Sequence, residues 1–400
     1  MGSIGLPSKD SSDVYLTTAT TAEIQVLQNA NSVEWKGALA LEPYLRREKH
    51  LASQDLTKDG GLTSWVLVWH PSSATERQVL CGCESINKRA VVSRNGKVEE
   101  AISHAIGSVF CLPSARGKGY AGRMMKELGE KLEHWQVDNG KKHLFSVLYS
   151  DIGKQFYAAR GWQPFPSSHI SLPASERPLP EGVQLLKSQD LASLCAADED
   201  LIRARLQKQG TNGRTTVSIV PDAQTAAWHH AREEFVAKEL YSKTPTIKGA
   251  KVGSVWAYWT RVWADPQGHD PNALHILRLV VEDEVLGADL SAATEKGTEA
   301  IDAAAEGRVQ LDGLDAGKIA ETLSSIKKIF EVAQTEAARW DMKEVMLWNP
   351  TNLALAGARQ VKEDVVVEER DEESICSLRW YGEGTWQDVD WIENMKYAWC

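Results

Sequence analysis

Residues 116–123 have the composition of a phosphate-binding loop. In order they are Arg116, Gly117, Lys118, Gly119, Tyr120, Ala121, Gly122 and Arg123. An apolar run, 106–112, precedes them, and a helical pattern over 123–135 follows. The first N–H groups of a helix have no intrahelical partner and can bind an anion, while glycine lets the backbone approach a ligand. The segment therefore predicts a phosphate site, to which Lys118 and Arg123 add positive charge.

A second constellation follows downstream. Residues 144–149 predict a buried strand, because they form a short apolar run between polar residues. Ser150-Asp151 then stands where a helix N-cap is expected, and Phe156, Tyr157, Gly161 and Trp162 follow. Between the two constellations, Met125, Leu128, Leu132 and Trp135 form one apolar helical stripe. Strand, loop, helix and strand thus alternate in the order that an α/β sheet requires.

Both constellations resemble signatures of the GNAT superfamily of acyl-CoA-dependent N-acetyltransferases. Arg116, Gly119 and Ala121 fit its Arg/Gln-x-x-Gly-x-Gly/Ala pyrophosphate loop, and Phe156-Tyr157-x-x-x-Gly161-Trp162 fits its second signature. The resemblance implies acetyl-CoA as cosubstrate and no metal. It also implies that the strand before the loop holds the pantetheine arm and that Tyr157 lies beside the sulfur. The implied cofactor-binding residues are Val109, Phe110, Cys111, Leu112, Arg116, Gly117, Lys118, Gly119, Tyr120, Ala121, Gly122, Arg123 and Tyr157.

Length and order predict two folded parts. We expect a flexible tail over 1–13, a GNAT domain over 14–175, and a C-terminal α/β domain over 176–400, with a proline-rich linker at 171–180. The fold class is α/β (α+β), with a central mixed, mostly antiparallel, twisted sheet. Residues 274–380 repeat the order of strands and helices, which predicts a degenerate GNAT-like domain. No phosphate-loop pattern precedes its helix at 316, so we expect it to bind no CoA. A generic α/β domain is the alternative.

The composition argues against some classes of binding partner and favours one cellular compartment. The formal net charge is −10 and basic residues are scattered, so nucleic acid and anionic membranes are poor partners. No apolar run has the length of a membrane span, and the first residues lack a signal-peptide core. Six cysteines lack Cys-x-x-Cys spacing, which favours reduced thiols, no metal site and a cytoplasmic location. The oligomeric state is left open.

The acceptor is inferred from a further resemblance. The stretches 16–20 and 41–48, Trp35, and the Trp-rich C-terminal part are similar to the fungal L-lysine N6-acetyltransferases of lysine catabolism. This implies transfer of acetyl to the side-chain amine of free L-lysine by direct attack in a ternary complex. Glu42 and Arg46, with Arg47, are candidates for binding the ammonium and carboxylate of the amino acid. Exposed helix charges are the alternative interpretation of these residues.

Proton transfer has three candidate groups. Tyr157 is the candidate acid that protonates the leaving thiolate. Many GNATs place a basic Glu on the strand before the loop, but Gly107 stands there in this sequence. His104, on the same predicted strand, is the candidate base. The carboxylate of Cys400 is another, because the aromatic-rich segment 391–399 predicts a docked chain end.

Two other functions compete with lysine acetylation. The first is a GNAT that acts on a protein amine or another small amine; an open groove would favour a protein, and a pocket between the domains a metabolite. The second is a non-catalytic acyl-CoA-binding protein, which Arg116 and Tyr157 argue against.

Overall fold

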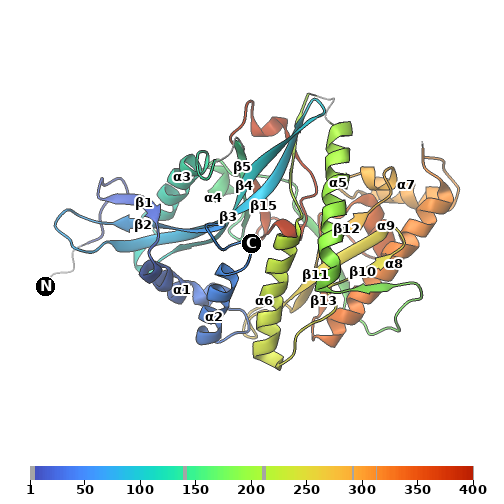
Figure 1. Cartoon of the computed structure of the whole chain (residues 1–400), viewed down its shortest axis with the longest axis horizontal. Coiled ribbons are helices and arrows are strands. Elements are labelled where there is room, and N and C mark those ends of the chain that lie inside the picture. Colours follow the sequence, from blue (N-terminus) through green and yellow to red (C-terminus); the bar gives the residue numbers. More distant parts are fainter. Residues whose placement is uncertain (1–4, 138–141, 210–212, 291, 312, 400) are drawn as a thin grey trace.

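The computed structural model describes residues 5–137, 142–209, 213–290, 292–311 and 313–399. The described chain forms two lobes side by side, each with a twisted sheet and flanking helices (Figure 1). In both sheets antiparallel pairs predominate and one pair of neighbouring central strands is parallel. The predicted mixed, mostly antiparallel α/β fold is confirmed.

The first sheet has the order β1-β2-β3-β4-β5-β15-β6, with β9 beside β3 and β16 beside β9. Its parallel pairs are β4–β5 and β9–β16. The strands are β1 (Val14–Thr18), β2 (Leu62–Trp69), β3 (Gln78–Arg94), β4 (Lys97–Cys111), β5 (Lys142–Ser150), β6 (Gln163–Pro164), β9 (Thr215–Ile219), β15 (Ile375–Trp380) and β16 (Val389–Trp391).

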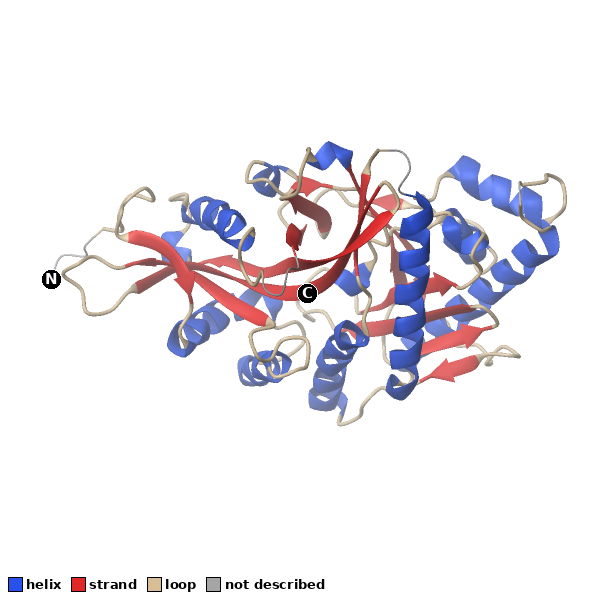
Figure 2. Ribbon diagram, turned by 45° about the horizontal axis from the view of Figure 1, so that its top comes forward, coloured by secondary structure: helices blue, strands red, loops and turns tan. Residues whose placement is uncertain are grey.

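Strands β3 and β4 form a long hairpin that joins the lobes (Figure 2). Asn95 and Gly96, at its tip, have φ of 52° and 76°, the left-handed conformation of a two-residue turn that matches the twist of the strands. Near the tip, the Ser93 hydroxyl donates to the Leu206 carbonyl of α5 (Leu191–Gln209) at 2.9 Å. The hairpin is therefore fastened to a helix of the second lobe.

The second sheet has the order β14-β7-β13-β12-β11-β10-β8. Its parallel pair, β12–β13, is joined by the long buried helix α8. The strands are β7 (Ser168–Pro173), β8 (Gln184–Leu186), β10 (Gly249–Val252), β11 (Val255–Val262), β12 (Ala273–Val281), β13 (Glu344–Trp348) and β14 (Glu368–Glu369). Strand, crossover helix and parallel strand repeat the β4–α3–β5 order of the first sheet.

The two sheets exchange strands. β15 lies late in the sequence, yet it pairs antiparallel with β5 in the first sheet. β7 lies earlier, in the stretch that includes part of the predicted linker, yet it pairs antiparallel with β13 in the second sheet. The expectation of a linker from residue 171 was wrong, and the end of the repeated stretch 274–380 pairs in the first sheet, because strand pairing here is decided by contacts distant in sequence. The lobes cannot separate without breaking both sheets.

Helices cover both faces of each sheet (Figures 1 and 2). In the first lobe, α3 packs on one face, and α1 and α2 lie toward the other. In the second lobe, α8 packs across β10–β13 and contacts α7 and α9, while α6 packs on β11. The remaining helices are α1 (Thr21–Trp35), α2 (Leu41–Ala52), α3 (Tyr120–Leu132), α4 (Gln155–Ala158), α6 (Ala223–Tyr241), α7 (Glu295–Ala305), α8 (Ala316–Arg339) and α9 (Asn352–Arg359). Short 3-10 turns are η1 (Pro113–Ala115), η2 (Ser188–Asp190), η3 (Leu286–Ala288), η4 (Trp386–Asp388) and η5 (Lys396–Ala398).

The last described residues are docked into the structure, as their aromatic composition predicts. Tyr397 and Ala398 are fully buried. The Tyr397 hydroxyl donates to the Ile219 carbonyl at 2.6 Å, and a ring nitrogen of His229 lies 3.0 Å from the Tyr397 carbonyl oxygen. This segment thus fills the space between β9 and α6. In the described part of the chain, no helix has both the length and the apolar character needed to cross a membrane.

Candidate active site

Strands β4 and β5 separate at one end and open the site. Their pairing ends at Ile106 and Leu148, although β4 continues to Cys111. Along β4, two residues oppose one on β3 between the pairs Glu84–Gly107 and Gly82–Phe110, and Ser108 has a φ of 53°. Such a bulge bends a strand and is frequent beside active sites. Three predicted pantetheine contacts, Val109, Phe110 and Cys111, line the cavity that opens there, and Leu112 is not among its lining residues.

The predicted phosphate loop follows on the same wall. Gly117 and Gly119 have φ of 74° and 83°, which only glycine adopts without strain. Gly119 precedes α3 and supplies no side-chain cap, unlike Thr20 before α1, so it leaves the helix N-terminus accessible to an anion. The loop residues that line the cavity are Arg116, Gly117, Gly119, Tyr120, Ala121 and Gly122. Lys118 does not line it.

Arg123 has a different role from the predicted one. Its guanidinium donates to the carbonyls of Lys9, Ser11 and Val14 and pairs with Glu127 at 2.6 Å. The Tyr120 hydroxyl also donates to the Pro7 carbonyl. The described part of the predicted flexible tail, residues 5–13, is therefore held against α3. The expectation of a flexible tail was therefore wrong for these residues. The sequence did not reveal the contact, because no pattern in it shows that Arg123 donates to backbone carbonyls of this segment.

Arg160 supplies a cation that sequence reasoning missed. It lines the same cavity, and its guanidinium stacks on Phe156 at 3.9 Å from the ring centroid. A Cβ atom at Gly122 would lie 2.5 Å from its terminal nitrogen, so Arg160 lies against the first turn of α3. Only the small residue at 122 allows this approach. The signal available in the sequence was an arginine next to Gly161 in the second signature.

Tyr157 reaches the cavity from α4, as predicted. Its side chain is buried and lines the cavity. Burial raises the pKa of the phenol above its ordinary value, and the nearby Cys83 acts in the same direction. The hydroxyl is therefore protonated at neutral pH and able to donate a proton.

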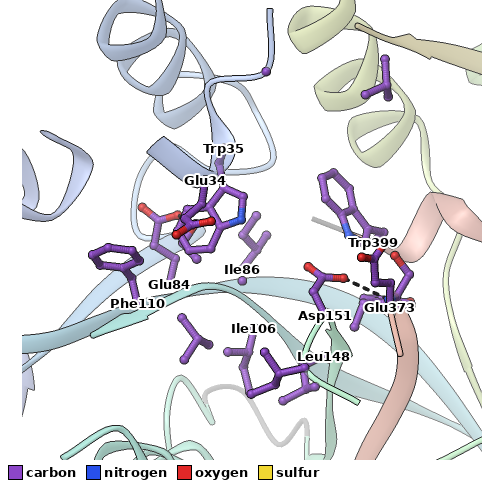
Figure 3. A pocket seen from close by; sticks show the side chains of 18 of the residues that line it. Glu34, Trp35, Glu84, Ile86, Ile106, Phe110, Leu148, Asp151, Glu373 and Trp399 are labelled. Carbon is purple, nitrogen blue, oxygen red and sulfur yellow. Dashed lines mark hydrogen bonds between the residues drawn. The ribbon is translucent and has the colours of Figure 1, made fainter. Parts of the chain in front are cut away.

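Glu84 is the most important group that the sequence did not reveal. It lies on β3 directly opposite Gly107, so the neighbouring strand supplies a carboxylate where β4 has none. The Ser108 hydroxyl donates to it at 2.9 Å. Burial, and then Glu48, raise the pKa of Glu84 to about 7, against the lowering effect of hydrogen bonds from Ser108 and Ser64. Figure 3 shows Glu84 at the end of the pocket near Phe110 and Trp35.

The predicted base His104 is not at this position. His104 is fully buried, and its ring nitrogens lie 3.1 Å from His143 and 2.9 Å from Gln136. It is not among the residues that line the cavity. Burial lowers the pKa of His104 to about 4, so the ring is neutral, but it is enclosed in a polar cluster behind the sheet. Cys400 lies outside the described residues.

Helix α2 forms part of the acceptor side, with a different face from the predicted one. Glu42 and Arg46 are exposed, and Arg46 pairs with Glu239 of α6 at 2.7 Å. Of the three candidates only Arg47 lines the cavity, together with Tyr44, Glu48 and Leu51. Substrate binding by this helix stays a prediction. The signal was the helical spacing of Tyr44 and Leu51, which places Arg47 and Glu48 on the same side.

The second lobe forms the other wall of the cavity. The whole space has a volume of about 1850 Å³ and reaches from the loop of α3 to α6, β12 and the segment 369–374. In Figure 3, Asp151, Glu373 and Trp399 lie at the opposite end from Glu84, with Ile106 and Leu148 between. In the described residues, no cluster of three His, Cys, Asp or Glu side chains suited to a metal ion is present.

A known domain family matches this chain. It is described as the LYC1 GNAT-like C-terminal domain, and it matches residues 169–400, more than half of the chain. The chain belongs to this family. The lysine acetyltransferase of Yarrowia lipolytica is 23% identical over 282 residues, covering 60% of this chain and 70% of that protein. The uncharacterized protein YGR111W of Saccharomyces cerevisiae is 30% identical over 168 residues, covering 36% of this chain and 41% of that protein.

Solved structures similar to this LYC1-like chain were also found. The GCN5-related N-acetyltransferase from Kribbella flavida has a TM-score of 0.47 and 13% identity, over 92% of this chain and 71% of that one. N-myristoyltransferase of Saccharomyces cerevisiae with bound myristoyl-CoA has a TM-score of 0.49 and 10% identity, over 95% and 81%.

Family membership, with the two sheets, identifies the LYC1-like protein as a GNAT-type acetyltransferase with a GNAT-like C-terminal domain. Membership implies acetyl-CoA as the acetyl donor. In the second lobe, the Asp315 side chain caps α8 by accepting from the Lys318 N–H at 2.9 Å. A carboxylate thus occupies the helix N-terminus that corresponds to Gly119 before α3. That the second lobe binds no CoA stays a prediction, which a titration giving two acetyl-CoA per chain would contradict.

A negative charge placed in the loop before α3 tests whether this loop binds the phosphates of acetyl-CoA. Gly119→Asp is expected to weaken acetyl-CoA binding at least tenfold, about 1.4 kcal/mol, because a carboxylate would face the phosphates. Calorimetric titration measures the affinity. Gly182→Asp is the matched control, since Gly182 also has a positive φ, 77°, and a Cβ there meets nothing. Equal affinity in both variants would contradict the assignment.

Proposed function

We propose that this chain transfers the acetyl group of acetyl-CoA to the side-chain amine of free L-lysine. The observation that carries the proposal is one continuous cavity that begins at the loop of α3 and ends between the lobes. Its walls come from both sheets and from α2 and α6. A pocket between lobes suits a small acceptor better than a protein chain. The relative named lysine acetyltransferase supports a lysine amine as the acceptor.

In this proposal Glu84 receives the first proton. A lysine ammonium has an ordinary pKa of about 10.4 and must become a neutral amine before attack. The pKa of Glu84 is raised to about 7, so near neutral pH a substantial fraction is ionised and is a stronger base than an ordinary carboxylate. Glu84 lies on β3 opposite the start of the bulge in β4, beside the place where the thioester is expected.

The remaining steps involve the thioester and Tyr157. The amine nitrogen forms a bond to the thioester carbonyl carbon, and the oxyanion faces N–H groups of the bulge near Phe110. The C–S bond then breaks, and the sulfur takes the phenolic proton of Tyr157. The nitrogen loses two protons in all. Glu84 takes the first and releases it to solvent. The second leaves as the amide forms and replaces the proton that Tyr157 gave to the sulfur. The products are N6-acetyllysine and CoA.

Removing the phenolic hydroxyl tests the acid. Tyr157→Phe is expected to lower kcat about 10²-fold with little change in acetyl-CoA affinity, because the ring stays and only the proton donor is lost. Tyr241→Phe is a control, since Tyr241 is exposed and lies outside the cavity. Steady-state thiol release gives kcat for both. Near-normal turnover of Tyr157→Phe would leave Tyr157 a packing role only.

The acceptor itself is tested by thiol release from acetyl-CoA with a panel of amines. The panel contains L-lysine, L-ornithine, a polyamine and a lysine-containing peptide, and mass spectrometry identifies the product. We expect L-lysine to give the highest kcat/KM and N6-acetyllysine as product. Preference for the peptide would move the function to protein acetylation. Acetyl-CoA binding without turnover on any amine would indicate a non-catalytic protein.

A further inference from the structure

Arg232 is a cation without an anionic partner in the described part of the chain. It lies on α6 and lines the cavity. Its guanidinium lies over the ring of Trp399, 5.7 Å from the ring centroid. Burial lowers the pKa of Arg232 to about 9, which still leaves the group charged at neutral pH. A guanidinium has five N–H donors, so this side chain can still bind a planar anion.

Glu48, the carboxylate that acts on the pKa of Arg232, is already engaged. Glu48 accepts two hydrogen bonds from Arg47, at 2.8 and 2.6 Å, and Arg47 also donates to the Trp35 carbonyl at 3.1 Å. Arg47 and Glu48 therefore neutralise each other. Glu48 therefore compensates the charge of Arg232 only in part, and no ion pair joins the two side chains.

Lys396 adds a second cation to this wall. It is 8% exposed and lines the cavity, and its ammonium lies over Trp348 and Trp399, at 4.0 and 4.4 Å from their ring centroids. No hydrogen bond or ion pair joins its ammonium group to another described residue. Burial lowers the pKa of Lys396 to about 7, and Arg370 and Arg232 lower it further against the opposite effect of Asp151. Two buried cations that form no ion pair with a described residue are costly, so an anionic ligand would be favoured here.

The two cations and Glu84 share one cavity. Tyr44 lies within electrostatic range of both Arg232 and Glu84, and Glu48 acts on the pKa of each. Because both side chains line the same cavity, a small molecule that carries an amine and an anionic group suits the pair. Its amine would point toward the thioester and its anion toward the second lobe.

We propose that Arg232, with Lys396 beside it, binds the free α-carboxylate of the acceptor amino acid. The inference rests on the proposed function, and it adds the requirement for an unblocked carboxylate. It makes an internal lysine of a protein a poor substrate, because its carboxyl group is part of a peptide bond. The specificity then comes from a pairing that only a free amino acid can supply.

Substrate analogues test the requirement on the unmodified enzyme. L-Lysine, lysinamide and pentane-1,5-diamine carry the same ε-amine, but only L-lysine carries a carboxylate. We expect kcat/KM for lysinamide and for the diamine to be about 100-fold lower than for L-lysine. Equal kcat/KM for all three would overturn the proposal while leaving acetyl transfer to a small amine in place. No acetylation of any of them would remove the proposed function as well.

Variants at Arg232 test whether this side chain recognises the carboxylate of the acceptor. Arg232→Gln is expected to lower kcat/KM for L-lysine about 100-fold and to change the value for the diamine less than threefold. Arg232→Lys keeps the charge and should recover part of the loss. Arg46→Gln is the control, because Arg46 is exposed and paired on the other face of α2. Thermal unfolding of each variant monitors the fold.

Two results would overturn this assignment. Equal losses on L-lysine and the diamine would mean that Arg232 supports the cavity without recognising a carboxylate. Weaker acetyl-CoA binding by Arg232→Gln, measured by calorimetry, would mean that its anion is a CoA phosphate.

Discussion

Glu84→Gln is expected to lower kcat/KM for the acceptor about 10³-fold, with acetyl-CoA affinity unchanged. The amide has the size of the carboxylate and can keep a hydrogen bond to Ser108, but it cannot accept a proton from the ammonium. The loss therefore belongs to the chemical step. Thiol-release kinetics and calorimetric titration with acetyl-CoA separate the two effects.

The pH profile gives an independent readout of the same group. The base form of Glu84 is the ionised one, and its pKa is raised to about 7. Activity should therefore fall as the pH drops below about 7 and should rise to a plateau above it. In Glu84→Gln this inflection should be absent from the residual activity.

A second carboxylate serves as the control for Glu84. Glu34 lies near Glu84 in Figure 3, but its side chain is 52% exposed. Glu34→Gln should keep the pH inflection and most of the activity. A Glu84→Gln enzyme with more than a tenth of normal kcat/KM would show that another group takes the proton.

The sequence was sufficient for the part of the site that is local along the chain. The loop before α3 depends on glycines at fixed spacing and on the helix that follows, so the sequence could place Arg116 and Gly119 at the site, and both line the cavity. Tyr157 was found in the same way, because the second signature is continuous. Docking of the segment around Tyr397 followed from large apolar groups that are costly to leave in water.

The remaining part of the site depends on contacts between distant segments. Glu84 replaces a missing carboxylate only because β3 pairs with β4 in the register that sets it opposite Gly107. The exchange of β7 and β15 has no signal in either strand, since both are short and mix apolar with polar residues. His104 failed as a base because strand alternation did not reveal which face of β4 is turned to the cavity. Which face of α2 is turned to the cavity likewise depends on how this helix packs on α6, which is distant in sequence.

Buried charges were also invisible in the sequence, and they lead to the largest expected effect on stability. Arg278 of β12 is fully buried and makes two hydrogen bonds to Asp198 of α5, at 2.8 and 2.7 Å. It also donates to Glu393, which accepts from Arg205 at 2.9 Å. The cluster links the second sheet, α5 and the C-terminal segment. A pattern of scattered Arg, Asp and Glu predicts exposed residues, whereas pairing makes their burial tolerable.

Arg278→Met is expected to lower the free energy of unfolding by about 3–5 kcal/mol, because it leaves the buried carboxylate of Asp198 without its paired cation and leaves Glu393 paired with Arg205 alone. Urea titration measures the change. Arg46→Met is the matched control: it removes an arginine of the exposed pair with Glu239 and should cost less than about 1 kcal/mol. Because Glu393 precedes Lys396 and Trp399, loss of the pair should also loosen the cavity wall, and protease cleavage after the C-terminal basic residues should accelerate. A cost no larger than that of Arg46→Met would mean that the cluster does not hold the C-terminal segment in place.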